Sequence, residues 1–190
     1  MELLEKRIIS EGSILPGNVI KVGSFLNHQI DVKLLLEMGR EVKRLFEGEK
    51  ITKILTVEAS GIAVATAFAA VMDTMVVFAK KHGTSNISGD IICCRTHSYT
   101  HNNDYNMVVE KKYLTGQDRI LIVDDFLANG QALNSLVDIV RQSDAELVGC
   151  AVAIEKGFQH GGDKLRQKGI RVESLAIIDS IENGEIRFRK

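Results

Sequence analysis

The chain has 190 residues, a formal net charge of −1 and 45% hydrophobic residues, which suits one compact domain with a substantial core and excludes a disordered chain. Because the charge is nearly neutral and no basic run is present, nothing in the sequence favours binding to nucleic acid or to a membrane surface. The spacing of Cys93, Cys94 and Cys150 fits neither a disulfide framework nor a metal site. Since no stretch resembles a signal peptide or a membrane span either, we expect a cytoplasmic protein with reduced thiols.

The first part of the chain predicts a short helix, a turn-rich stretch and a longer helix. Residues 1–10 have amphipathic spacing, and the mixed segment 13–29 favours short edge strands around a turn at Gly23. Asp31 is typical of a helix N-cap, because apolar residues follow it at helical spacing as far as Phe46.

Two later segments each predict a buried strand, a loop of small residues and a helix. Residues 51–57 precede the loop Glu58-Ala59-Ser60-Gly61, and residues 120–123 precede the sequence DDFLANGQAL. A helix N-terminus after such a loop favours an anion through its free N–H groups and its dipole, and Gly130 allows close approach. The sequence predicts two anion sites, although an ordinary turn with two solvated aspartates is the alternative at Asp124 and Asp125.

The middle of the chain predicts a third strand followed by a long polar excursion. Residues 75–79 form this strand and end in Lys80 and Lys81, which either face a bound anion or form a solvated basic turn. The polar segment 83–110 predicts a flexible lid, because long loops in compact domains are usually functional or disordered. Its hairpin arms are expected at residues 91–92 and 107–109, and its candidate lid residues are His97, Ser98, Tyr99 and His101.

The last part of the chain completes an alternating pattern of strands and helices. Residues 147–154 predict a buried strand, a short polar helix follows at residues 163–168, and late strands are expected at residues 172–178 and 186–188, joined by an Asn183-Gly184 turn. Alternating strands and helices imply right-handed crossovers, so we expect an α/β fold with a doubly wound, mostly parallel sheet.

The segment ILIVDDFLANGQAL resembles the phosphoribosyl diphosphate signature of the type I phosphoribosyltransferase family, in which an apolar strand precedes two aspartates and a helix start of the form A-x-G-x-A. The usual family pattern has Thr at position 129 and often Gly at position 131. This chain has Asn129 and Gln131, and in this it resembles the purine-salvage branch of the family that acts on xanthine. The resemblance covers most of the chain. It implies a single domain over residues 1–190, with a small hood subdomain from about residues 1–30 and 157–190 and a lid over about residues 83–110.

The resemblance also implies the reaction, which joins xanthine to 5-phosphoribosyl 1-diphosphate and gives xanthosine 5′-monophosphate and diphosphate. The implied catalytic residues are Asp124 and Asp125, whose carboxylates face the ribose hydroxyls. The diphosphate loop is expected to contain a strained peptide bond around Ala59 and Ser60. The implied residues for phosphoribosyl diphosphate are Ala128, Asn129, Gly130, Gln131, Ala132, Glu58, Ala59, Ser60, Gly61, Lys80 and Lys81.

For the xanthine base, the resemblance implicates Ile20, Asn27, Lys156 and Phe158. A lysine ammonium only donates hydrogen bonds, so Lys156 suits an oxo group on the purine and does not suit an amino group. The alternative for Lys156 is a surface lysine paired with Glu155. Mg²⁺ is expected to arrive with the diphosphate rather than through direct protein ligands, and the family pattern implies a homodimer.

Three other functions fit parts of the pattern. The nearest is transfer to guanine, hypoxanthine or adenine in place of xanthine. A non-catalytic regulator that senses phosphoribosyl diphosphate is a second, but no basic recognition helix precedes the predicted helix at Asp31. A receiver-like phosphoacceptor is a third, but its paired acids would end the first strand of the domain, and Asp124 and Asp125 come much later.

Overall fold

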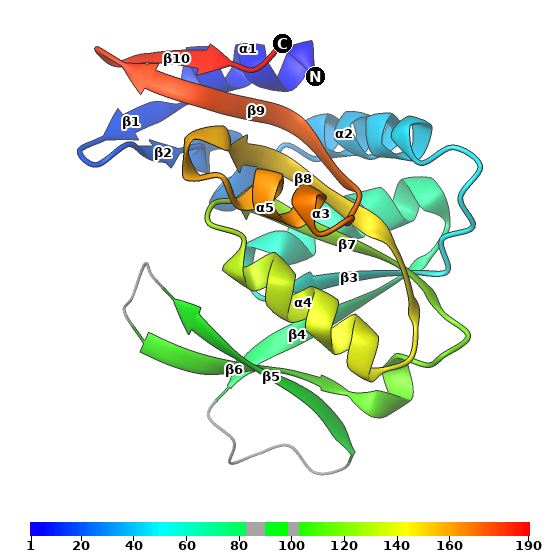
Figure 1. The fold of residues 1–190 in the computed structure, drawn as a ribbon. Coiled ribbons are helices and arrows are strands. Elements are labelled where there is room, and N and C mark those ends of the chain that lie inside the picture. Colours follow the sequence, from blue (N-terminus) through cyan, green and yellow to red (C-terminus); the bar gives the residue numbers. More distant parts are fainter. Residues whose placement is uncertain (83–89, 99–102) are drawn as a thin grey trace.

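The computed structural model describes residues 1–82, 90–98 and 103–190. Within these residues the central feature is an eight-stranded sheet in the order β10-β9-β8-β7-β3-β4-β6-β5 (Figure 1). Strands β9, β8, β7, β3 and β4 are parallel to one another, and β10, β6 and β5 pair in antiparallel fashion at the two edges. The predicted α/β class with a mostly parallel sheet is confirmed. The strands are β3 (Lys53–Val57), β4 (Met75–His82), β5 (Ile91–Ser98), β6 (Asn103–Glu110), β7 (Arg119–Leu127), β8 (Glu146–Lys156), β9 (Val172–Glu182) and β10 (Glu185–Phe188).

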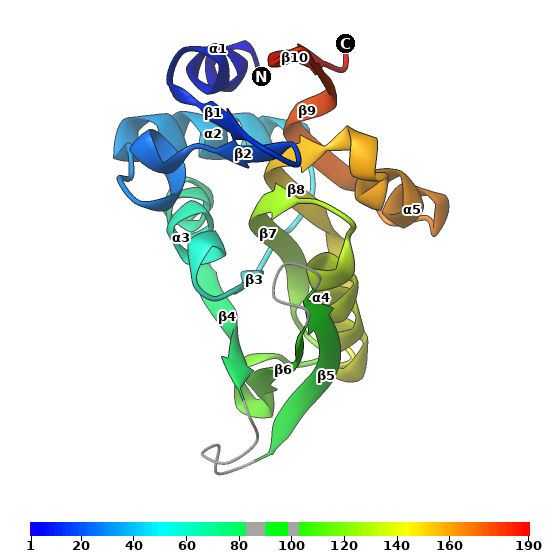
Figure 2. The same ribbon diagram turned by 90° about the vertical axis from the view of Figure 1, so that its left-hand side faces the viewer.

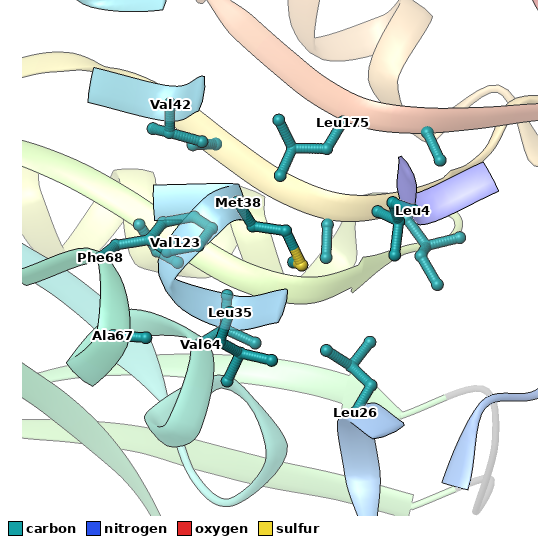
Figure 3. Close-up of a cluster of buried hydrophobic side chains, with 14 of the residues drawn as sticks. Leu4, Leu26, Leu35, Met38, Val42, Val64, Ala67, Phe68, Val123 and Leu175 are labelled. Atoms are coloured by element: carbon teal, nitrogen blue, oxygen red, sulfur yellow. The ribbon is translucent and has the colours of Figure 1, made fainter. Parts of the chain in front are cut away.

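Helices cover both faces of this sheet, with α2 and α3 on one side and α4 and α5 on the other (Figure 2). The side chains of β7 alternate between the two faces, which gives two hydrophobic cores. Leu121 and Val123 belong to the core under α2 and α3, part of which Figure 3 shows, whereas Ile120 and Ile122 belong to the core under α4. The helices are α1 (Glu2–Glu11), α2 (Val32–Leu45), α3 (Ser60–Met72), α4 (Gln131–Gln142) and α5 (Gly161–Gln167).

The N-terminal segment differs in part from the prediction. A two-stranded sheet forms from β1 (Ser13–Leu15) and β2 (Val19–Lys21), but residues Gly23–Asn27 form a single π-helical turn and no edge strand. Phe25 and Leu26 are both fully buried, and adjacent residues of a strand would point to opposite faces. The turn therefore lets both side chains reach the core. The N-cap prediction is confirmed, because Asp31 Oδ1 accepts a hydrogen bond from the N–H of Leu34 at 3.1 Å.

Several strands run further than the sequence predicted, and three of these extensions include predicted site residues. Strand β4 continues through Lys80 and Lys81, β7 continues through both aspartates, and β8 continues through Lys156. The reason is the neighbouring backbone: Asp124 pairs with Val152 and β7 remains in register with β8 as far as Leu127. Polar side chains do not end a strand while the adjacent strand still supplies hydrogen-bond partners.

Two hairpins behave as predicted. Residues 91–92 pair with residues 109–110 in the antiparallel β5–β6 hairpin, and the Asn183-Gly184 turn joins β9 to β10 with both turn residues at positive φ.

Tyr99 and His101 of the predicted lid lie outside the described residues. The hood division stays a prediction, and its second segment supplies β9 and β10 to the central sheet. Within the described ranges, no helix is long and apolar enough to cross a bilayer.

Met38 of α2 lies in the core that Figure 3 shows and is fully buried. We expect Met38→Ala to lower the free energy of unfolding by about 2–5 kcal/mol, since truncation loses buried apolar contacts and leaves a cavity. Urea unfolding followed by circular dichroism measures this change. Val32→Ala, at an exposed position of the same helix, serves as the control and should change the value by less than about 0.5 kcal/mol.

Candidate active site

The predicted site residues gather where three neighbouring strands end. Strands β3, β7 and β8 are adjacent and parallel, so their carboxyl ends lie at the same edge of the sheet (Figure 2). The predicted diphosphate loop follows β3, the predicted phosphate loop follows β7, and the predicted base segment follows β8. Ligands of open α/β sheets bind at this edge, beyond the carboxyl ends of the strands.

Asp125 joins three separate parts of the chain. Its Oδ1 accepts a hydrogen bond from Ser60 Oγ at 2.9 Å, and its Oδ2 accepts one from Asn27 Nδ2 at 2.9 Å. Ser60 is the first residue of α3, directly after the loop that follows β3, and Asn27 belongs to the π-helical turn near the N-terminus. A residue predicted for the sugar, one for the diphosphate and one for the base are therefore in direct contact.

Asp124 lies beside Asp125 and is almost completely buried. Its Oδ1 accepts a hydrogen bond from the backbone N–H of Asp125 at 3.0 Å. Burial, followed by the charge of Asp125, raises the pKa of Asp124 well above its usual range. A side chain at position 61 would not fit here, because a Cβ on Gly61 would lie 2.9 Å from Asp124 Oδ1 and 2.2 Å from Thr56 Oγ1.

The loop after β3 contains a cis peptide bond between Glu58 and Ala59. The sequence predicted an unusual peptide bond around Ala59 and Ser60, so the observed one lies one residue earlier. The Glu58 carboxylate accepts a hydrogen bond from the backbone N–H of Lys81 at 2.6 Å, which ties this loop to β4.

The structure separates the two lysines of β4. Lys80 and Lys81 are adjacent in β4, so their side chains point to opposite faces of the sheet. The positive charge of Lys81 acts on Asp124 and partly offsets the rise in the pKa of that carboxyl group. The ammonium of Lys81 also lies 5.6 Å from the ring centroid of Tyr105. Lys81 is therefore on the side of Asp124, and the role of Lys80 at the diphosphate stays a prediction.

The loop after β7 forms a compact turn at the start of α4. Gly130 has φ +85°, a left-handed conformation that favours glycine, and its carbonyl accepts a hydrogen bond from Asn134 Nδ2 at 2.7 Å. Asn129 Oδ1 accepts a hydrogen bond from the N–H of Gln131 at 3.2 Å, so this side chain stabilises its own turn. Ala128 precedes this turn and Ala132 lies in the first turn of α4.

The four residues predicted for the base have different environments. Asn27 contacts Asp125 as described, and Ile20 is buried in the core under α2 and α3. Lys156 is half-buried, its ammonium lies 5.8 Å from the ring centroid of Phe126, and burial lowers its pKa. Phe158 is partly buried against the same core as Ile20. Both ribbon views place β2 next to the end of β8, which brings the two halves of this predicted set to one region (Figures 1 and 2).

The suggested pairing of Lys156 with Glu155 is wrong. Glu155 is fully buried, and Arg166 of α5 donates to both of its carboxylate oxygens, at 3.0 and 2.7 Å. Sequence analysis did not single out Arg166. The available signal was an acidic residue at the end of an otherwise apolar strand, since a buried carboxylate requires a cationic partner.

A family model described as the phosphoribosyl transferase domain matches residues 28–184 of this chain. The chain belongs to this family. A xanthine phosphoribosyltransferase of Lachnoclostridium phytofermentans is 52% identical over 191 residues, which cover 100% of this chain and 98% of that protein. A xanthine phosphoribosyltransferase of Clostridium novyi is 51% identical over 189 residues and covers 100% of both chains.

Solved structures of phosphoribosyl transferase family members show the same fold. The adenine phosphoribosyltransferase of Rhodothermus marinus superposes with a TM-score of 0.76 at 20% identity, over 94% of this chain and 100% of that one. The enzyme of the same name from Saccharomyces cerevisiae superposes with a TM-score of 0.76 at 18% identity, over 92% and 99% of the two chains. The predicted type I phosphoribosyltransferase fold is confirmed.

Asp124 gives a prediction for the pH dependence of stability. Because its pKa is raised in the folded state, the folded state binds more protons than the unfolded state between the two pKa values, and the free energy of unfolding falls as pH rises through this window. We expect Asp124→Asn to remove this cost and to raise the melting temperature at pH 8. The gain should shrink as pH falls toward the ordinary carboxyl range.

Thermal unfolding between pH 5 and pH 8 tests this expectation. Asp138→Asn changes an exposed carboxylate on α4 and serves as the control, whose melting temperature should change little across the range. A melting temperature of Asp124→Asn below that of the unmodified protein at every pH would contradict the prediction.

Proposed function

We propose that this protein transfers the phosphoribosyl group of 5-phosphoribosyl 1-diphosphate to xanthine, forming xanthosine 5′-monophosphate and diphosphate in purine salvage. The observation that carries the proposal is the contact of Asp125 with Ser60 and Asn27, which joins the predicted sugar, diphosphate and base residues. The choice of xanthine is supported by the relatives of that name, which are about half identical over the full chain. The likeness to adenine phosphoribosyltransferases, at about 20% identity, concerns the fold alone.

The 5-phosphate of the sugar binds at the N-terminus of α4, in the loop of residues 128–132. The helix dipole and the N–H groups of its first turn favour an anion there. The left-handed turn at Gly130 gives this loop its tight shape. The ribose then extends along the end of β7 toward Asp124 and Asp125.

The two carboxylates act on the ribose ring. As diphosphate leaves, positive charge develops on the sugar, and adjacent carboxylates stabilise this charge more in the transition state than in the ground state. The burial of Asp124 strengthens the effect, because charges interact more strongly where water is excluded. A purine nitrogen attacks the opposite face of the ring, so no side-chain nucleophile takes part.

The diphosphate binds between the loop after β3 and Lys81 of β4. Ser60 and Gly61 begin α3 and present its N-terminus, while Lys81 supplies a positive charge on the side of the aspartates. Mg²⁺ would arrive with the diphosphate and take its oxygen ligands from the substrate and from water rather than from protein side chains. When bound, the ion neutralises charge on the diphosphate oxygens.

The base binds near Lys156, whose half-buried ammonium donates to the oxo groups of xanthine. The amino group of guanine or adenine would face a donor there and lose this interaction. Asn27 and Ile20 approach from the N-terminal segment, and Phe158 from the turn after β8. We further propose that the protein is a cytoplasmic homodimer.

A parallel assay of purified protein with xanthine, guanine, hypoxanthine and adenine tests the substrate. We expect the highest kcat/KM for xanthine, because it is the only one of the four bases with oxo groups at both C2 and C6 of the purine. A higher kcat/KM for another base would overturn the assignment of xanthine, and no transfer to any base, with phosphoribosyl diphosphate still bound, would favour a regulator.

Asp125→Asn separates catalysis from binding. We expect kcat to fall by about 100-fold or more, because the variant loses charge stabilisation in the transition state, while KM for phosphoribosyl diphosphate changes by less than about tenfold. Steady-state kinetics measure both quantities, with Asp138→Asn as the control. A rise in KM with kcat unchanged would mean that this carboxylate serves binding only.

A further inference from the structure

An ion pair between the buried Glu155 and the partly exposed Arg166 lies directly behind the predicted phosphate loop. Glu155 has no exposed surface, and Arg166 donates to it through both terminal nitrogens, at 3.0 and 2.7 Å. Ser174 Oγ also donates to the Glu155 carboxylate, and Arg166 Nε donates to the carbonyl of Val172 at 3.2 Å. This forked geometry fixes the direction of both side chains, and hence the place of α5 relative to β8 and β9.

The first turn of α5 lies between this ion pair and the phosphate loop. A Cβ on Gly162 would lie 2.1 Å from Glu155 Oε1, so the helix backbone rests against the ion pair. A Cβ on Gly161 would lie 2.2 Å from the carbonyl oxygen of Ala128 and 2.6 Å from the N atom of Gly130, so the same turn rests against the loop. No space remains on either side, and a shift of α5 must therefore move the loop.

A second contact joins the far end of α5 to the same loop. Lys168 Nζ donates to Asn134 Oδ1 at 2.8 Å, and Asn134 Nδ2 donates to the carbonyl of Gly130 at 2.7 Å. In the sheet, Glu155 pairs with Leu127, the last residue of β7 before the loop begins. The ion pair thus lies level with the start of the loop, and Lys156 of the predicted base site is the next residue along β8.

We infer that Glu155 and Arg166 are positioning residues for phosphoribosyl diphosphate, because their ion pair holds α5 against Ala128, Asn129 and Gly130 and so sets the shape of the phosphate loop. This inference rests on the proposed function, in which that loop binds the 5-phosphate. Neither residue touches the ligand. Because Glu155 has no exposed surface, loss of its partner would leave an uncompensated buried charge. Loss of the charge of Glu155 would leave Arg166 only Asp163, at 3.6 Å, as an acidic partner and would free its side chain to move.

The test compares two variants of the pair with a matched control. Glu155→Gln keeps the shape of the side chain but removes its charge, and Arg166→Lys keeps the charge but loses the fork. The control is Asp118→Asn. Asp118 is also buried and accepts from Lys53 Nζ at 2.8 Å and Thr115 N at 2.8 Å, but it lies just before β7 begins, at the opposite end of that strand from the site.

Calorimetric titration with ribose 5-phosphate and steady-state kinetics give the readout. We expect Glu155→Gln to raise the dissociation constant of ribose 5-phosphate and KM for phosphoribosyl diphosphate by roughly 10- to 100-fold, with a smaller rise in KM for xanthine, because misplacement by a remote change has effects of this order. Arg166→Lys should show the same pattern to a smaller extent. Asp118→Asn should lower the melting temperature and leave both KM values unchanged.

The outcomes separate this inference from the proposed function. If both pair variants lower the melting temperature but keep the KM values of the unmodified protein, the ion pair is only structural and the inference is wrong. If Glu155→Gln does not fold, Arg166→Lys decides by the same measurements. If the unmodified protein neither binds ribose 5-phosphate nor transfers the sugar, the proposed function fails and the inference fails with it.

Discussion

The carboxylate of Asp125 is the contact on which the arrangement of the site depends. It lies on β7, in the middle of the sheet, and its two oxygens accept hydrogen bonds from Ser60 after β3 and from Asn27 in the N-terminal segment. Hydrogen bonds to a charged acceptor are stronger than neutral ones and more directional in effect. One side chain therefore connects three segments that are far apart in the sequence.

This arrangement lowers the stability of the folded protein, as the raised pKa of Asp124 indicates. Two adjacent buried carboxylates repel each other. Lys81 and the N–H of Asp125 partly offset this cost at Asp124, and Ser60 and Asn27 donate hydrogen bonds to Asp125. The surrounding strands keep the pair in place, because β7 is paired on both sides and packed on both faces. Such unfavourable placement is typical of functional groups, since a sequence selected only for stability would not retain it.

The two hydrophobic cores, one on each face of the sheet, support different loops of the site. The core under α2 and α3 supports the loop after β3 and the N-terminal segment, whereas the core under α4 supports the loop after β7. The helix α5 extends the second layer and closes behind the phosphate loop. Rigid elements thus carry short polar loops at one edge, an arrangement that suits precise positioning of a charged sugar.

The sequence alone determined what depends on neighbouring residues: the alternation of strands and helices, the cap at Asp31, the turn at Asn183 and Gly184, and the motif with its two aspartates. Tertiary structure decided what depends on distant pairing. It extended three strands through polar residues, placed Lys81 on the side of Asp124, and paired Glu155 with Arg166 in place of Lys156. The contact between Asn27 and Asp125 spans 98 positions. No local pattern encodes such a contact, because it follows from the order in which the strands assemble into a sheet.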